Sequence, residues 1–259
     1  MIQVQNITHH YGIRPVLKHI SLHVQKGELL ALMGPNGMGK STLLAVIAGL
    51  LSPIKGTVTI NGLLRRSTPE NELAIRKLIA YLPAEAWFPP LKTGREWLVA
   101  VGQLYGVEDE ALMDHIDRLL ALFELTKQAD STMSSYSTGQ KRKITLCATL
   151  VTQAPILLLD EPFAGGLDPS AILALKRVLQ HLAQTQAATI ILATPVPELV
   201  AELAHRIAII HHGQLVACDT LDTLRTHTGL TGDLADVYQH LVNPEIHANL
   251  DRYFQGQPK

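Results

Sequence analysis

The chain is poor in the features that mark secreted and membrane-spanning proteins. Its 259 residues contain only two cysteines, Cys147 and Cys218, so the sequence does not indicate a disulfide framework and fits a reducing compartment. The longest apolar runs, such as residues 154–159 and Thr189–Ala193, are strand-sized and too short to span a bilayer. The N-terminus lacks the basic and then apolar regions of a secretory signal. If a membrane is involved in the function, another chain must cross it.

The chain also lacks an excess of either charge. Its 22 lysines and arginines nearly balance 23 aspartates and glutamates, and the formal net charge of −1 argues against a basic nucleic-acid surface. Hydrophobic residues make up 47% and charged residues 17%, which allows a large core and argues against global disorder. The pairs His9 and His10, and His211 and His212, do not favour a metal site, because adjacent strand residues point to opposite faces. We interpret them as surface or turn histidines.

The pattern of apolar residues predicts an α/β domain. Residues 2–24 read as strands with a turn at Tyr11 and Gly12, and helical patterns cover residues 40 to about 51 and 169–182. Asp168 is the expected N-cap of the second helix. Alternation of continuous apolar strands with helices predicts a mostly parallel sheet covered on both faces. The expected strands of this part are Leu29–Met33, residues 55–61, Ile79–Leu82, residues 156–159, Thr189–Ala193 and residues 207–210.

The segment from about residue 84 to residue 150 changes to a helical pattern. Residues 111–125, for example, carry apolar side chains at helical spacing. We therefore expect one domain over residues 1–220, with an inserted helical subdomain at about 84–150. Residues 221–259 are expected to form a C-terminal tail, in which an amphipathic helix packs on the core.

Residues 34–42, Gly-Pro-Asn-Gly-Met-Gly-Lys-Ser-Thr, match the Walker A pattern in full between an apolar strand and a helix. Glycines let the backbone wrap so that N–H groups converge on a phosphate, and the helix N-terminus adds positive charge. Lys40 is expected on the β- and γ-phosphate oxygens and Ser41 on Mg²⁺. An accidental glycine turn before a helix is the alternative. The nucleotide-binding residues predicted from this loop are Asn36, Gly37, Gly39, Lys40, Ser41 and Thr42.

A second motif follows the apolar strand at residues 156–159. Asp160 and Glu161 stand at the carboxyl end of this strand, the edge of a parallel sheet at which ligands bind. We expect Asp160 to hold Mg²⁺ and Glu161 to polarise the attacking water as the catalytic carboxylate. By itself the pair could be two solvated acids at a strand end. Together with the Walker A loop it predicts a site for ATP and Mg²⁺.

Residues 136–140, Tyr-Ser-Thr-Gly-Gln, resemble the signature sequence of the ABC-type ATPases, usually Leu-Ser-Gly-Gly-Gln. They stand just before a helical pattern and at the usual distance upstream of Asp160. With the two nucleotide motifs they identify the chain as a member of the ABC family over roughly residues 2–219. The resemblance implies a P-loop NTPase core with a mostly parallel sheet flanked by helices, an N-terminal antiparallel β element and an inserted helical subdomain.

The resemblance also assigns roles to further residues. It implies that the signature grips the γ-phosphate held by a second ABC subunit, so that two domains dimerise head to tail around two ATP molecules. It places Tyr11 on the adenine, Val16 beside it, and Asp168 in the loop that reaches across the dimer. An ordinary Ser/Thr N-cap remains the alternative for the pentapeptide alone. The signature residues expected in this role are Ser137, Thr138, Gly139 and Gln140.

Three positions depart from the family pattern. Ala84 stands where the family usually has a glutamine that contacts Mg²⁺ and the attacking water, and Glu85 follows it. Pro195 stands where the family usually has a histidine that holds the γ-phosphate, and proline offers neither a side-chain donor nor a backbone N–H. One extra residue, Gly165 or Gly166, separates Glu161 from Asp168. The binding half of the site is therefore expected to be intact and the hydrolytic half weakened.

The resemblance implies a transport function. A separate integral membrane permease would be the partner, on the cytoplasmic face of the membrane, and residues 232–241 resemble the tail of exporter ATPases of the drug, lipid and sodium efflux branch. Trp87 and Phe88 are either part of the permease docking cleft or core residues of the subdomain. Two alternatives stay open: a nearly inactive, nucleotide-gated regulatory or structural subunit, and, ranked last, a soluble ABC ATPase acting on DNA or ribosomes.

Overall fold

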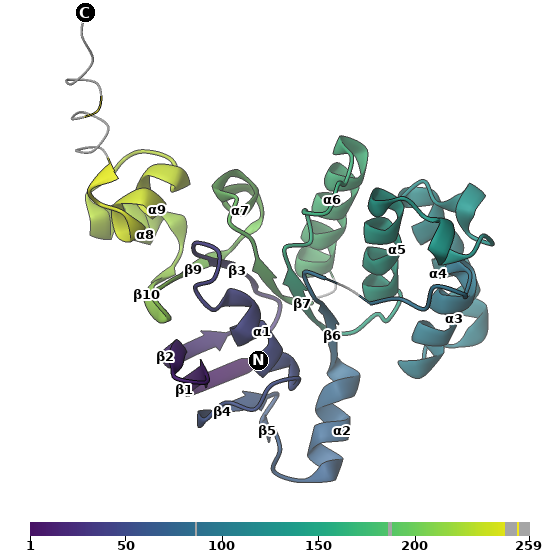
Figure 1. Ribbon diagram of the computed structural model, residues 1–259, viewed down its shortest axis with the longest axis horizontal. Coiled ribbons are helices and arrows are strands. Elements are labelled where there is room, and N and C mark those ends of the chain that lie inside the picture. The colour runs from purple at the N-terminus through teal and green to yellow at the C-terminus, as the bar shows by residue number, and fades with distance from the viewer. Residues whose placement is uncertain (86, 186–187, 247–252, 254–259) are drawn as a thin grey trace, which may run out of the picture.

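A computed structural model describes residues 1–85, 87–185, 188–246 and 253 of the chain. This part forms an α/β fold with a four-stranded antiparallel sheet and a six-stranded, mostly parallel sheet. Figure 1 shows three helices in a row along one side of the larger sheet, α5 (Thr138–Leu150), α6 (Pro169–Thr185) and α7 (Pro197–Leu203). Helix α1 (Lys40–Ala48) lies with the antiparallel sheet on the other side. The predicted fold class, with its N-terminal antiparallel β element, is confirmed.

The antiparallel sheet is built by the N-terminal strands in the order β2-β1-β4-β5. Alternate side chains of β1, including Ile2 and Val4, are buried, as expected for a strand with one face on a core. The register of β1 shifts beyond Val4, so the strand is irregular where it approaches Tyr11. The strands are β1 Ile2–Tyr11, β2 Arg14–Val24, β4 Lys55–Ile60 and β5 Leu63–Leu64.

The larger sheet has the order β10-β9-β3-β8-β7-β6. Its strands are parallel except β10, which pairs antiparallel with β9 at one edge. Every residue of β3, β7 and β8 is buried, which explains why these runs are apolar throughout instead of alternating. The strands are β3 Leu29–Met33, β6 Ile79–Leu82, β7 Ile156–Asp160, β8 Thr189–Ala193, β9 Arg206–His211 and β10 Gln214–Asp219.

Helices cover both faces of this sheet. Helix α1 (Lys40–Ala48) buries Leu43 and Ile47 in a cluster with Leu158 and Ile191 of the sheet and with the antiparallel strands. On the other face, α6 (Pro169–Thr185) buries Leu175 and its neighbours in a second cluster. Helix α2 (Pro69–Leu78) buries Ile75 in the same cluster as α1. Two further helices are α7 Pro197–Leu203 and α8 Leu221–Thr228.

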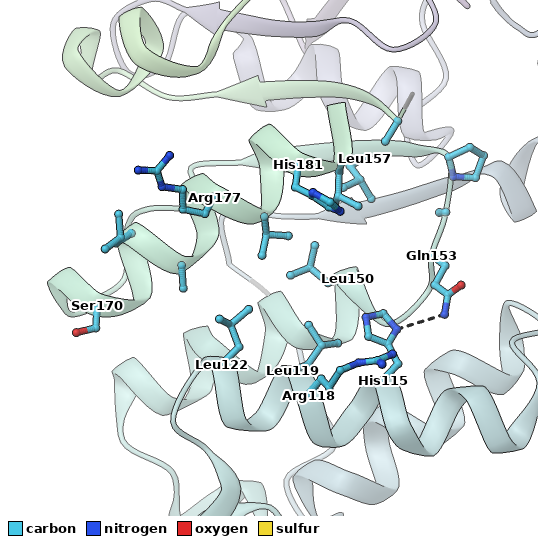
Figure 2. A pocket seen from close by; sticks show the side chains of 17 residues that line it. His115, Arg118, Leu119, Leu122, Leu150, Gln153, Leu157, Ser170, Arg177 and His181 are labelled. Atoms are coloured by element: carbon cyan, nitrogen blue, oxygen red, sulfur yellow. Dashed lines mark hydrogen bonds between the residues drawn. The ribbon is translucent and has the colours of Figure 1, made fainter. Parts of the chain in front are cut away.

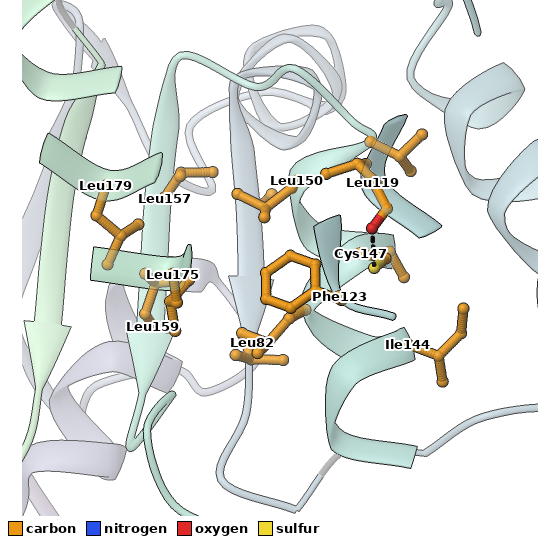
Figure 3. Close-up of a cluster of buried hydrophobic side chains, with 14 of the residues drawn as sticks. Leu82, Leu119, Phe123, Ile144, Cys147, Leu150, Leu157, Leu159, Leu175 and Leu179 are labelled. Atoms are coloured by element: carbon orange, nitrogen blue, oxygen red, sulfur yellow. Dashed lines mark hydrogen bonds between the residues drawn. The ribbon is translucent and has the colours of Figure 1, made fainter. Parts of the chain in front are cut away.

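Helices fill the segment predicted as an inserted subdomain. They are α3 Gly94–Leu104, α4 Asp109–Leu122, the short 3₁₀ turns Thr126–Gln128 and Met133–Ser135, and α5 Thr138–Leu150. Figure 3 shows Phe123, just after α4, among Leu82 and Leu150, so the core of this segment is continuous with that of the sheet. Cys147 is fully buried there, which raises the pKa of its thiol. Whether the segment is a separate subdomain stays a prediction.

The C-terminal tail includes the predicted amphipathic helix, α9 Leu234–Val242. Asp233 caps it by accepting a hydrogen bond from the backbone N–H of Asp236 at 3.0 Å. Leu234, Val237 and Tyr238 are buried against strands β3 and β9. No helix in the described ranges is long and apolar enough to cross a membrane.

The structure corrects one local expectation, for His9, and decides one open alternative, for Trp87. His9 is buried, with 9% of its surface exposed, and it packs edge-on against Tyr11, so it is not a surface histidine. Trp87 is 78% exposed, which excludes the core interpretation for that residue. Phe88 is half-buried against the core and lies under the Lys141 ammonium, 5.5 Å from its ring centroid.

Candidate nucleotide site

The loop between β3 and α1 adopts a conformation that glycine makes possible. Gly34 and Gly39 have positive φ angles of 153° and 104°. A Cβ atom on Gly34 would lie 2.2 Å from the carbonyl oxygen of Ile210, and one on Gly39 would lie 2.9 Å from that of Val16. The loop therefore packs directly on the backbones of β9 and β2, and a side chain at either position would push it away.

The side chain of Lys40 is hydrogen-bonded to the phosphate loop itself. Its Nζ atom donates hydrogen bonds to the carbonyl oxygens of Gly34 at 2.7 Å and Pro35 at 3.1 Å. The residue is buried, and this burial lowers the pKa of the ammonium, while the carboxylates of Glu161 and Asp160 act in the opposite direction. A bound phosphate would exchange the carbonyl contacts of Lys40 for stronger, charge-assisted ones.

Asp160 lies at the end of β7 with only 2% of its surface exposed. Its Oδ1 atom has no hydrogen-bond partner, and burial raises the pKa of the carboxyl group, an effect that a hydrogen bond from Ser41 partly offsets. An orphaned carboxylate oxygen beside an exposed hydroxyl fits Mg²⁺, which takes one or two protein oxygens and fills its shell with water and phosphate oxygens. The described residues contain no cluster of three or more His, Cys, Asp or Glu side chains suited to another metal.

Glu161 occupies an unusual backbone conformation. Its φ angle is 46°, in the left-handed region that non-glycine residues seldom adopt. The backbone N–H donates to the carbonyl oxygen of Ala193 at 2.8 Å, which ties the end of β7 to the end of β8. Residues held in such conformations concentrate at functional sites, where the surrounding structure fixes them. The catalytic role expected for Glu161 stays a prediction.

Arg142, which the motif analysis missed, connects several parts of this site. Its guanidinium donates to the carbonyl oxygens of Asp160 at 3.2 Å and Glu161 at 2.6 Å. It also donates to those of Pro83 at 3.3 Å and Ala84 at 3.2 Å. In the sequence Arg142 stands only as the middle one of three successive cations, residues 141–143, within a helical pattern. Buried arginines need partners, but the burial of Arg142 is visible only in the fold.

Ser137 of the signature is the N-cap of α5. Its hydroxyl accepts from the Gln140 backbone N–H at 3.3 Å, and the Gln140 side chain accepts from the Ser137 backbone N–H at 2.8 Å. The alternative interpretation as a cap is thus correct for the local geometry of Ser137. Thr138 is exposed, and among the described residues no hydrogen bond links residues 137–140 to the phosphate loop. The cross-dimer role of these four residues stays a prediction.

The signature helix packs on the loop that contains Asp168. A Cβ atom on Gly139 would lie 2.9 Å from the carbonyl oxygen of Gly166. Lys143 forms an ion pair with Asp168 at 2.6 Å, and this contact lowers the pKa of the carboxyl group. Asp168 also caps α6 by accepting from the backbone N–H of Ala171 at 2.9 Å, as predicted. Gly165 and Gly166 both have positive φ angles, so this longer loop turns through two left-handed glycines.

The remaining predicted binding residues lie in the phosphate loop, in the first turn of α1, and in or beside strands β1 and β2. Tyr11 is 54% exposed at the end of β1, and Val16 is half-buried beside Gly39. Asn36 and Gly37 form the exposed tip of the loop, and Thr42 is buried in the first turn of α1. The structure therefore offers one exposed aromatic face and one exposed loop tip, and their contacts with a nucleotide stay predictions.

The two degenerate positions lie at the ends of β6 and β8. Ala84 and Glu85 are exposed after β6, and Pro195 is half-buried two residues beyond the end of β8. Neither Ala84 nor Pro195 carries a polar side-chain atom. The backbone carbonyl of Ala84 is bound by Arg142, so this position joins the polar network only through its main chain.

Strand, glycine loop and helix, with an acidic pair at the end of a neighbouring parallel strand, define a P-loop nucleotide-binding domain. The family model described as "ABC transporter" matches residues 17–164. The chain belongs to the ABC transporter family.

Curated relatives carry related names. The linearmycin resistance ATP-binding protein LnrL of Bacillus subtilis is 31% identical over 230 residues, which cover 88% of this chain and 72% of LnrL. The Nod factor export ATP-binding protein I of Paraburkholderia xenovorans is 33% identical, over 83% of this chain and 69% of the relative. EcsA of Bacillus subtilis, an ABC-type transporter ATP-binding protein, is 29% identical over 95% of this chain and 98% of EcsA.

Solved structures agree with this assignment. An ATP-binding subunit of an ABC transporter superposes with a TM-score of 0.85 at 31% identity, over 93% of this chain and 99% of that chain. The dimeric structure of MJ0796, a bacterial ABC transporter cassette, gives a TM-score of 0.77 at 26% identity, over 85% of this chain and 99% of MJ0796. The fold is therefore that of an ABC ATPase cassette, including its P-loop core.

Proposed function

We propose that the chain is the ATP-binding subunit of a membrane exporter, and that it binds Mg-ATP well but hydrolyses it slowly in its own site. The observation that carries the binding half is the convergence of Lys40, Ser41 and Asp160. A cation, a hydroxyl and an orphaned carboxylate oxygen lie together at the N-terminus of α1. This set supplies the contacts that a β,γ-phosphate pair and Mg²⁺ require.

The hydrolytic half of the proposal rests on Ala84 and Pro195. Glu161 remains beside the phosphate site to polarise water, but neither degenerate position carries a side chain that can orient that water or hold the γ-phosphate. Loss of one positioned polar contact commonly costs about 10²–10³ in rate. The two losses need not multiply, because residues that act as a unit are not additive. Slow turnover is therefore the expected outcome.

The proposed working unit is a dimer. In it, Ser137, Thr138, Gly139 and Gln140 of one subunit would contact the γ-phosphate on the phosphate loop of the other. The exposed α5 N-terminus and the dimeric MJ0796 cassette support this arrangement. The second subunit is either another copy of this chain or a different ABC ATPase with intact residues at the two degenerate positions.

The proposed transport partner is a separate integral membrane permease at the cytoplasmic face of the membrane. Trp87 is 78% exposed and lines a small cavity of about 190 Å³ together with Trp97 and Tyr105. Trp97 and Tyr105 are half-buried, so the exposed Trp87 ring beside this hollow is the part suited to an apolar segment of a partner. The export direction rests on the names of the relatives, which include a resistance protein and an export protein.

Equilibrium ATP binding and steady-state turnover of the purified chain test this function, with Glu161→Gln as the control. We expect ATP binding that requires Mg²⁺ for full affinity, with turnover barely above that of Glu161→Gln. Rapid turnover that the substitution abolishes would contradict the hydrolytic half. Absence of ATP binding would contradict the proposal as a whole.

A second candidate function is a nucleotide-gated regulatory subunit that does not hydrolyse ATP. Ala84 favours this candidate, because its side chain has no polar atom and its carbonyl oxygen is already bound by Arg142. Turnover indistinguishable from Glu161→Gln, in the presence of the permease as well as in its absence, would select this candidate over a slow motor.

A further inference from the structure

A cleft of about 1080 Å³ lies between α4 and α6. None of the residues that line it belongs to the candidate nucleotide site. Its volume matches the upper end of small-molecule sites, which span roughly 300–1000 Å³. In Figure 2 the two helices form opposite walls, with Leu119 and Leu122 on the lower wall and Leu150 between the walls.

The inner surface of the cleft is apolar. Leu119, Leu150 and Leu157 are buried where they line the cleft, yet Leu122 of α4 is 44% exposed and Leu173 of α6 is 54% exposed. Exposed leucines on facing helices are not unusual singly, but here both line one hollow that connects to the buried core. An apolar group placed in the cleft would cover them, and this burial favours binding.

The walls of the cleft carry cationic and imidazole groups on both sides. Arg118 and His115 come from α4, and Arg177 and His181 come from α6. No aspartate or glutamate is among the described residues that line the cleft. Arg118 pairs with Asp114 one helical turn away at 2.9 Å, but both side chains are largely exposed, so this pair contributes little and does not compete strongly with a ligand.

One end of the cleft is closed. The segment with Gln153, Ala154 and Pro155 connects α5 to β7 across this end, and the Gln153 amide lies 3.3 Å from the His115 Nδ1 atom. Figure 2 shows this loop at the end of the cleft opposite Ser170. A long partner helix would need a groove that is open at both ends, so the closed end favours a small ligand.

We propose that this cleft binds a small amphiphilic anion, a molecule with an apolar body and one carboxylate or phosphate group. The apolar body covers Leu122 and Leu173, and the anionic group lies near the basic side chains of the walls. Guanidinium groups bind either anion through charge-assisted hydrogen bonds. The inference does not depend on the rate of ATP hydrolysis, because it concerns residues outside the nucleotide site.

The test is calorimetric titration of the full chain with three probes of nearly equal tail length: dodecanoate, dodecyl phosphate and dodecyltrimethylammonium, each below its micelle concentration. We expect saturable binding of at least one anion at a single site, with the cation binding at least about tenfold more weakly. The tighter anion identifies the head group. Absence of saturable binding, or equal affinity for the cation, would overturn the proposal.

Matched charge variants test whether the anion binds in this cleft. The double variant Arg118→Gln/Arg177→Gln removes two exposed cations from the cleft, and Lys77→Gln/Lys127→Gln removes two exposed cations elsewhere. We expect the first pair to weaken anion binding about tenfold and the second to leave it unchanged. Leu122→Asp, also at an exposed position, should weaken it as well. Equal losses in the two double variants would overturn the assignment, as would full affinity in Leu122→Asp.

Discussion

The guanidinium of Arg142 donates a 2.6 Å hydrogen bond to the carbonyl oxygen of Glu161. This contact joins the helix that follows the signature to the end of the strand that carries the candidate catalytic carboxylate. The same group binds the carbonyl of Ala84, at the position where the family glutamine is missing. Arg142 thus links its own helix to the backbone of two segments around the site, residues 83–84 and 160–161, through main-chain oxygens alone. These contacts therefore do not depend on the side chains of those segments.

Arg142→Ala is expected to destabilise the protein by about 2–4 kcal/mol, because it leaves buried carbonyl oxygens without a donor. Arg142→Lys keeps the charge but not the fork of donors, so it should recover part of this loss. Urea unfolding measures both effects. Lys141→Ala, at the neighbouring half-buried position above Phe88, serves as the control and should cost less than about 1 kcal/mol. Equal losses at 141 and 142 would contradict this account of Arg142.

Lys143→Gln is expected to raise the pKa of Asp168 toward its ordinary value, because the Lys143 ammonium is the main cause of its depression. A carboxyl group with a depressed folded-state pKa contributes stability above its unfolded pKa, and that contribution is lost as pH falls through the folded pKa. The variant should therefore lose less stability than the parent on acidification. NMR titration of the Asp168 carboxyl group measures the pKa, and an unchanged value would show that the pair is not formed.

Gly34→Ala and Gly37→Ala form a matched pair in the phosphate loop. A Cβ atom on Gly34 would meet the Ile210 carbonyl oxygen at 2.2 Å, whereas nothing lies within 4 Å of one on Gly37. Both have positive φ angles, so Gly37→Ala should cost only about 1 kcal/mol of backbone strain. Gly34→Ala should displace the loop and abolish ATP binding. Thermal unfolding and ATP titration measure the two outcomes, and similar ATP affinities would contradict the close packing of the loop on β9.

Asp160→Asn is expected to stabilise the nucleotide-free protein and to weaken Mg-ATP binding. Burial raises the pKa of Asp160, so the folded protein without metal loses stability as pH rises through that pKa. The amide removes the charge and should add about 1–2 kcal/mol at neutral pH. Unfolding in EDTA gives the stability, and ATP titration with and without Mg²⁺ gives the affinity. A variant that is less stable and still responds to Mg²⁺ would exclude Asp160 as the metal ligand.

The sequence predicted those parts of the structure that follow from local rules. Buried parallel strands are apolar throughout, so β3, β7 and β8 were predictable, and the full Walker A spacing located the turn before α1. The N-cap at Asp168 follows from side-chain chemistry at one position. Strand β10 lacks such a signal, because only Leu215, Ala217 and Cys218 of it reach the core, and these only in part.

The remainder depends on tertiary contacts that a linear pattern does not contain. Arg142 and Lys143 are cations in a helix, and only the fold shows that one binds four carbonyl oxygens and the other binds Asp168. The burial of His9 has the same origin, since β1 is irregular at this point and the Tyr11 ring packs edge-on against the imidazole. Trp87 is exposed in spite of its size, which composition alone does not predict.

The most direct test of the proposed weak hydrolysis is the single-turnover rate of ATP cleavage in the double variant Ala84→Gln/Pro195→His, measured beside the parent chain and Glu161→Gln. The two substitutions restore the side chains that the family pattern has at these positions. The account predicts a rate roughly 10–10³-fold above the parent, which itself lies near the Glu161→Gln baseline. A parent that already cleaves ATP far above this baseline, with no gain in the double variant, would contradict it.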